Sequence, residues 1–126
     1  MPSAEWFIRL PFAAAFLYHG AGKLLAPLQS AALLQLPASL LVVVGIAEIL
    51  VGLGALAGEL PAMPRRQMID RLAALVAIPV LIGAIALVHF PRYSFTPSPT
   101  HPLGGMEYQL LLLGVALWLL TRRTGV

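Results

Sequence analysis

The sequence contains no cysteine among its 126 residues. Disulfide bonds, dithiol redox chemistry, thiolate nucleophiles and thiolate-bound metals are therefore all excluded. Charged residues are also scarce, at 10% of the chain, whereas soluble domains average about 25%. With 60% hydrophobic residues and a mean hydropathy of +0.90, the chain has too little charge to cover a water-soluble globule of this size. We therefore expect the lipid bilayer to be its solvent.

The net charge of +3 does not indicate a nucleic-acid-binding protein. Its basic residues form no patch beside aromatic residues, as binding to nucleic acid would need. They lie instead at the ends of apolar segments, which is typical of membrane proteins. We expect no nucleic-acid partner.

Four stretches have the length of about 20 mostly apolar residues that an α-helix needs to span a bilayer. They cover residues 6–26, 38–58, 71–90 and 104–121. Their apolar runs are continuous rather than alternating, and they are too few to close a barrel of strands. The sequence thus predicts one all-α domain over residues 1–126, an integral membrane four-helix bundle.

The first stretch also resembles a secretory signal, but two basic residues speak against that interpretation. Arg9 lies inside the stretch, and Lys23 lies where a cleavage region would be. A signal has its basic residues before the apolar run, so we expect a membrane span here.

The basic residues predict the orientation of the four spans. Four spans place both termini and the second connection on one side of the membrane. That side carries Arg9, Arg65, Arg66, Arg71, Arg122 and Arg123, and the other carries Lys23 and Arg92. The positive-inside rule then places both termini in the cytoplasm. Arg9 and Arg71 are the expected anchors at the cytoplasmic ends of their helices.

Five ionisable residues fall in the apolar stretches or at their ends, toward the side opposite the termini. They are His19, Lys23, Glu48, His89 and Glu107. Each stretch contributes at least one, so we predict a polar cluster in the outer half of the bundle that binds a ligand or handles protons. Snorkelling by Lys23 and anchoring of helix ends by His89 and Glu107 are the alternative explanations.

Glu48 is the least compatible with a purely structural role. A charge at the centre of a spanning helix costs about 2.5–3.5 kcal/mol, so Glu48 needs a partner. His19 and Lys23 match its depth to within about one helical turn. We expect Gly20 to let the first helix approach the second closely enough for the partners to meet.

Two glycines should share the face of Glu48, because they lie three residues before it and four after it. Such glycines leave room for a partner helix or for a ligand. The expected lining of a ligand slot is Phe16, Tyr18, Gly45, Gly52 and Tyr108.

The longest connection covers residues 91–105 and contains four prolines. It is either a lid or binding loop or a solvated linker. We expect its prolines to deny it regular hydrogen bonding and to leave it mobile, with Thr96–Thr100 the loosest part. Pro79 lies midway along the third stretch and predicts a kink there. The short connection 26–37 is expected to hold an interfacial turn.

Four pieces of the sequence resemble the DoxX family of small four-helix bacterial membrane proteins. They are RLPFAAAFLYHGAGKL, GIAEILVGLGALAG, RLAALVAIPVLIGAIALVH and GGMEYQLLLLG, one in each stretch and in order. The resemblance includes Arg9, Phe16, His19, Gly20, Lys23, Glu48, Gly52, Arg71, Ala73, Ala74, His89 and Glu107. Ala13 and Pro79 depart from it, since such proteins often carry glycine at the first position and methionine or another helix former at the second.

The resemblance implies a link to redox chemistry, because some relatives are linked to thiosulfate–quinone oxidoreductases and others to quinone detoxification or oxidative-stress complexes. We therefore expect an accessory subunit that binds a quinone, a quinol or a similar small apolar ligand, with His19 and Glu48 at the ligand oxygens. No flavin, iron–sulfur or haem-attachment motif is visible, so the electrons would come from a partner redox subunit. At most, the chain is a non-autonomous part of an enzyme.

Two other functions stay open from the residues alone. One is a non-enzymatic assembly factor or scaffold, whose buried ion pair fixes helix register. The other is a small-molecule or proton carrier acting as a homo-oligomer. A metal bound by His19, Glu48, His89 and Glu107, or a haem between the two histidines, is chemically possible. Neither spacing is diagnostic of such a site, and we expect no metal.

Overall fold

The computed structural model describes residues 3–123, and regular secondary structure in that range is entirely helical. Its helices are α1 (Trp6–Leu25), α2 (Pro27–Leu34), α3 (Ala38–Ala57), α4 (Arg66–Ala84) and α5 (Glu107–Thr121). A π-helical segment, Ile85–His89, continues α4 directly. The range 3–123 contains no strand, so the all-α prediction is confirmed.

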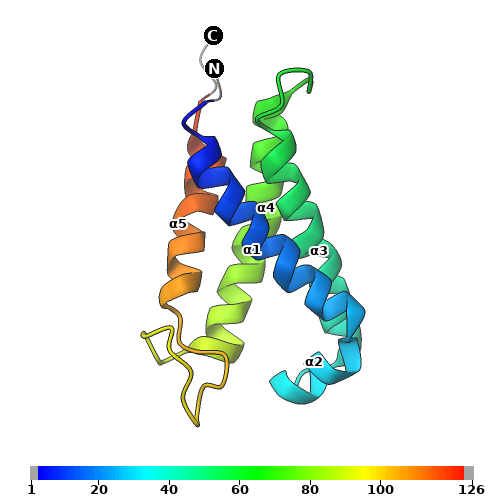
Figure 1. The fold of residues 1–126 in the computed structure, drawn as a ribbon, viewed down its shortest axis with the longest axis vertical. Helices are drawn as coiled ribbons and strands as arrows, with labels where there is room; N and C mark the ends of the chain where they lie inside the picture. Colours follow the sequence, from blue (N-terminus) through cyan, green and yellow to red (C-terminus); the bar gives the residue numbers. More distant parts are fainter. Residues whose placement is uncertain (1–2, 124–126) are drawn as a thin grey trace.

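The four long helices lie alongside one another, as Figure 1 shows. α1 packs on α3, α3 on α4, and α4 on α5. The start of α1, the α3–α4 connection and the end of α5 lie together at one end, which we call the terminal end. α2 and the loop of residues 90–106 lie at the opposite end, which we call the loop end.

The helix boundaries follow local sequence signals. α1 and α3 end within a residue of the predicted stretches. α4 begins five residues earlier than predicted, at Arg66, because a polar first turn precedes its apolar run. The connection predicted to hold a turn contains the short helix α2. α2 starts with Pro27, and proline is favoured at the first position of a helix. It ends before Gln35, whose left-handed backbone conformation is common just after a helix.

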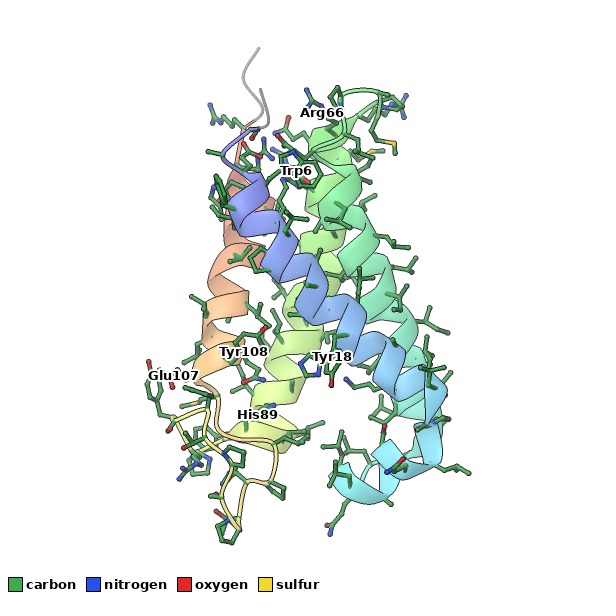
Figure 2. The ribbon with its side chains drawn as sticks, in the orientation of Figure 1. Trp6, Tyr18, Arg66, His89, Glu107 and Tyr108 are labelled. Carbon is green, nitrogen blue, oxygen red and sulfur yellow. The ribbon has the colours of Figure 1, made fainter. Side chains whose placement is uncertain are left out.

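Large apolar side chains stand out from the helices on the outer surface (Figure 2). On α3 the exposed ones recur every three or four residues and form a stripe: Leu40, Val43, Ile46, Leu50 and Leu53. Two helical stretches within the described residues, Ala38–Ala57 and Arg66–His89, are long and apolar enough to cross a membrane. α5 is apolar but shorter, with 15 residues.

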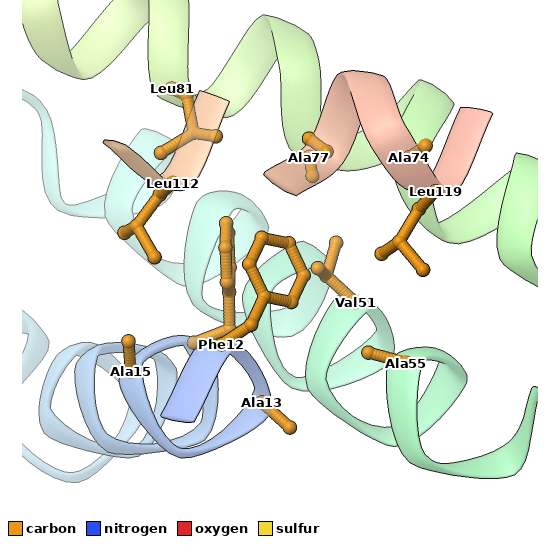
Figure 3. Packing of buried hydrophobic residues seen from close by; sticks show 12 residues of the cluster. Phe12, Ala13, Ala15, Val51, Ala55, Ala74, Ala77, Leu81, Leu112 and Leu119 are labelled. Atoms are coloured by element: carbon orange, nitrogen blue, oxygen red, sulfur yellow. The ribbon is translucent and has the colours of Figure 1, made fainter. Parts of the chain in front are cut away.

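The core combines phenylalanine rings with small side chains (Figure 3). Phe12 and Phe16 of α1 stack with ring centroids 4.8 Å apart. They meet small or branched residues of the other helices, and the fully buried ones among these are Val51, Ala55, Ala74, Ala77 and Ala116. Small residues at these positions let the helix backbones approach closely.

The loop of residues 90–106 is hydrogen-bonded, so the expectation that its prolines deny it regular bonding is wrong. Met106 N donates to Arg92 O at 2.7 Å, and Glu107 N donates to Tyr93 O at 2.8 Å. At the loop's tip, Ser98 and His101 exchange backbone hydrogen bonds of 3.0 and 3.1 Å. The prolines stand between the paired positions, so their missing N–H groups remove none of these bonds.

Gly104 closes this loop against Phe95. Its φ of +83° lies in the region that favours glycine. A Cβ at this position would also collide with the carbonyl oxygen of Phe95. The glycine pair before α5 is therefore part of the loop, and α5 begins at Glu107, three residues later than predicted.

Candidate functional site

A buried ion pair joins α1 to α3. Lys23 Nζ lies 2.9 Å from Glu48 Oε2 and 3.1 Å from Oε1, so the ammonium donates to both carboxylate oxygens. Glu48 is 7% exposed. The prediction that Glu48 has a basic partner on α1 is confirmed for Lys23. His19, the other predicted partner, is exposed and forms no hydrogen bond or ion pair with Glu48 within residues 3–123.

The pair forms because the two helices approach each other closely at Gly20. A Cβ on Gly20 would lie 2.8 Å from Gly45 O and 3.1 Å from Glu48 Cβ, distances that leave no room for it. The expected role of Gly20 is therefore confirmed. Gly45 and Gly52 face α1 at the same interface, where Leu24 covers the first and Leu17 the second. They serve helix packing at this interface, and their place in a ligand slot stays a prediction.

A cavity of about 320 Å³ opens beside the ion pair, between α2, α3 and α4. Lys23 and Glu48 lie on its wall, and the rest of the wall consists of leucine, valine, alanine, glycine and proline residues. Its size reaches the range of about 300–1,000 Å³ that is usual for small-molecule sites. We call this the apolar cavity.

α4 and the segment that continues it form one wall of the apolar cavity. Pro79 and Gly83 both line it, and a Cβ on Gly83 would meet no described atom within 4 Å. The π-helical segment that follows contributes Leu87 and Val88 to the same wall, and such segments occur frequently at functional sites. From the loop, Leu103 reaches the cavity edge.

A second, smaller cavity of about 70 Å³ lies on the other side of the ion pair, between α1, α4 and α5. Its polar lining consists of His19, Lys23, Glu48, Tyr108 and Gln109. The buried Oε1 atom of Gln109 has no hydrogen-bond partner within residues 3–123. We call this the polar cavity.

The aromatic residues predicted to line a slot have different positions. Phe16 and Tyr108 line the polar cavity. Tyr18 is 78% exposed and lies outside the polar cavity; it lines instead an open groove between α1 and α2, beside His19 and Lys23. Tyr18 follows Phe16 by two residues, a rotation of about 200° around the helix, which puts the two on opposite faces.

The predicted cluster of five ionisable residues divides into two groups. His19 is exposed at the rim of the polar cavity, one helical turn from Lys23. His89 is instead buried under the loop, with Nδ1 2.8 Å from Gly104 O. Glu107 accepts a hydrogen bond of 3.2 Å from Phe95 N. The last two residues thus hold the loop in place, as the anchoring explanation describes.

A second buried network of charges lies at the terminal end. The sequence places Arg9 and Arg122 at this end but does not predict their ion pairs. Arg9 and Asp70 are both 0% exposed. Arg9 donates to Asp70 through Nη1 and Nη2, each at 2.8 Å, and Arg122 donates to the same carboxylate at 3.0 Å. Arg9 is therefore a buried ion-pair partner rather than an interfacial anchor, whereas Arg71 is exposed.

Two further carboxylates complete this network. Glu5 pairs with both arginines, and Glu59 lies 3.5 Å from Arg9. Burial acts to raise the pKa of the Glu59 carboxyl, but interactions with the side chains of Ser3 and Glu5, together with the two arginines, outweigh it and hold the pKa below its usual value. Trp118 lies beneath both guanidinium groups, with its ring centroid 5.8 and 5.3 Å from them.

Compared with family models, curated proteins and solved structures, the chain has no match. The resemblance to the DoxX family therefore rests on the sequence pieces quoted above, and it stays a prediction. The two cavities and the ion pair between them define the chemistry available at the site.

Proposed function

We propose that the chain is a multi-pass inner-membrane protein of the DoxX type that binds a small apolar molecule with a polar head, such as a quinone or quinol. The ligand occupies the apolar cavity, and its head meets Lys23 and Glu48. The observation that carries this proposal is a cavity of about 320 Å³ whose apolar wall is interrupted by one buried ion pair.

The surface of the helices supports the membrane part of the proposal. Only 33% of the apolar window in Ala38–Ala57 and 28% of that in Arg66–His89 is buried inside the protein. A core helix of a water-soluble protein is mostly buried, so these helices need another apolar environment. Lipid would cover their exposed stripes, with the arginine-rich terminal end in the cytoplasm.

The ion pair suits both redox forms of a quinone. The Lys23 ammonium has three N–H donors, and its bonds to the two oxygens of Glu48 leave one for a quinone carbonyl. The Glu48 carboxylate has spare lone pairs that can accept from a quinol hydroxyl. A membrane partner with its own redox cofactor would exchange the electrons.

A scaffold remains the second candidate, because the ion pair also satisfies its own two charges and joins α1 to α3. Glu48→Gln distinguishes the two functions. The amide keeps the volume and one acceptor oxygen, and the Lys23 side chain left without its counter-charge is 17% exposed, so a scaffold should lose some stability but retain its assembly. A quinone site should lose quinol binding while the protein stays folded.

Filling the apolar cavity tests the proposal directly. Gly83→Leu places a side chain in the space that the glycine leaves, without a clash at Cβ. Gly114→Leu is the matched control, since a Cβ there also meets no described atom within 4 Å and the residue is exposed on α5. We expect Gly83→Leu to weaken binding of decylubiquinone at least tenfold, as measured by titration in nanodiscs, and Gly114→Leu to leave it unchanged. Equal binding by both variants would contradict the proposal.

A further inference from the structure

The polar cavity presents a hydrogen-bond acceptor that no protein group satisfies. Gln109 Oε1 is buried and has no partner within the described residues. An unpaired buried acceptor is unfavourable by about 1–3 kcal/mol, so such atoms in native proteins usually have a partner. The cavity beside it is where that partner would lie.

The size of the polar cavity limits what the partner can be. Its volume of about 70 Å³ is far below the roughly 300 Å³ at which small-molecule sites begin. A cavity needs about 10–15 Å³ of such volume to hold one water, and a buried water needs two to four polar partners. Gln109, Glu48 and Lys23 on the cavity wall supply them.

We infer that the polar cavity holds water and connects Glu48 with the aqueous phase at the loop end. The polar cavity lies on the side of the ion pair opposite the apolar cavity. The connection runs along α1. His19 and Lys23 line the polar cavity, and both also line an open groove between α1 and α2, together with Gln29 and Ser30.

Glu48 therefore lies between a wet and a dry compartment. On the wet side the groups facing it are Lys23 and His19 from α1 and Tyr108 and Gln109 from α5. α4 offers only Val80, Leu81 and Ala84 there. On the dry side Lys23 is the only other polar residue on the described wall.

This arrangement specifies a proton path for the proposed ligand site, and this path rests on the proposed function. On the described wall of the apolar cavity, Glu48 and Lys23 are the only polar residues, so a quinol bound there has no other group to take its proton. The proton that its hydroxyl gives to Glu48 leaves through the polar cavity, past His19, toward the loop end. A quinone that becomes reduced takes up its proton along the same path in reverse.

Thiol reactivity tests the hydration without any ligand, because the chain has no cysteine of its own. Leu112 lines the polar cavity and Leu41 lines the apolar cavity, and both are buried, at 8% and 2% exposure. Leu112→Cys and Leu41→Cys are thus a matched pair. A thiol reacts with silver ion as the thiolate, which forms where water is present.

We expect silver ion, in a chloride-free nitrate buffer, to block Leu112→Cys at least tenfold faster than Leu41→Cys. Maleimide labelling after unfolding would read out the block. A rate for Leu112→Cys no greater than that for Leu41→Cys would overturn the inference. A second measurement needs no cysteine variant. In the wild-type protein, the side-chain amide of Gln109 should show magnetisation exchange with water by NMR; the loss of its signal in Gln109→Leu assigns it. A Gln109 amide without water contact would overturn the inference.

The two proposals fail separately. If the silver ion reaches Leu112→Cys but decylubiquinone binds Gly83→Leu and wild type equally, the ligand proposal falls and the hydrated cavity stands. If Gly83→Leu loses binding but Leu112→Cys is unreactive, the ligand site stands and the proton path falls.

Discussion

Replacing Asp70 with asparagine should strongly destabilise the terminal end of the protein. Asp70 accepts two hydrogen bonds from Arg9 and one from Arg122, and it is fully buried. Asp70→Asn keeps the volume and one acceptor oxygen. It removes the negative charge and places an amide N–H₂ against one of the guanidinium groups.

The size of the effect follows from what remains around Arg9. Breaking a buried ion pair typically costs about 3–5 kcal/mol, because the other charge stays buried. Glu5 at 3.3 Å and Glu59 at 3.5 Å still face Arg9 and compensate in part. We therefore expect a loss of about 3 kcal/mol in the free energy of unfolding, the lower end of that range.

Unfolding by SDS in mixed micelles measures this loss. Trp118 lies over both arginines, so its fluorescence reports the network directly, and Trp6→Phe removes the signal of the other tryptophan. Arg71→Gln is the control, since Arg71 is exposed next to Asp70 and should change stability by no more than about 0.5 kcal/mol.

A double-mutant cycle then isolates the pair. Arg9→Met with Asp70→Asn should destabilise the protein less than the two single changes added together, because each single change leaves its partner unpaired. Additive effects, or a loss below about 1 kcal/mol for Asp70→Asn, would refute the view that this network holds the terminal end together.

Three further predictions concern packing, pH and orientation. Gly20→Ala should destabilise the protein and weaken the contact of α1 with α3, whereas Gly22→Ala, which meets no described atom, should be neutral or stabilising in the same SDS titration. The pKa of Glu59 lies below its usual value in the folded state, so its carboxylate stabilises the fold above the unfolded pKa and loses that effect as the pH falls through the folded pKa. Glu59→Gln should therefore reduce the loss in the free energy of unfolding that wild-type protein shows as the pH is lowered. A reporter fused to the C-terminus should be active if it works in the cytoplasm, and activity of a periplasm-only reporter would contradict the orientation.

The ion pair of Lys23 and Glu48 could be predicted because depth and charge are both visible in a sequence. A carboxylate in the middle of an apolar stretch needs a cation at the same depth, and α1 offers one beside a glycine. Depth does not fix the direction in which a side chain points. His89 precedes the loop in a π-helical segment, whose wider turn breaks the 3.6-residue period, and it faces the loop instead of the ion pair.

The network around Asp70 could not be predicted for a different reason. Arg9, Asp70 and Arg122 each lie near the end of an apolar stretch, where a charged residue is usually exposed at an interface. Their burial depends on how the ends of α1, α4 and α5 come together, which the apolar pattern of each helix leaves undetermined. The backbone pairing of residues 92–107 was missed likewise, because it depends on where the prolines stand and not on their number.

The most direct test of the account is the position at which a photoreactive quinone attaches. We expect an azidoquinone to label residues that line the apolar cavity, such as Leu41, Val44 and Leu87, and decylubiquinone to compete for this labelling. Gly83→Leu should abolish the competed labelling, and Gly114→Leu should preserve it. Labelling confined to the outward stripe of α3, insensitive to competition and to Gly83→Leu, would show that the quinone meets this protein only from the lipid, and the proposed site would be wrong.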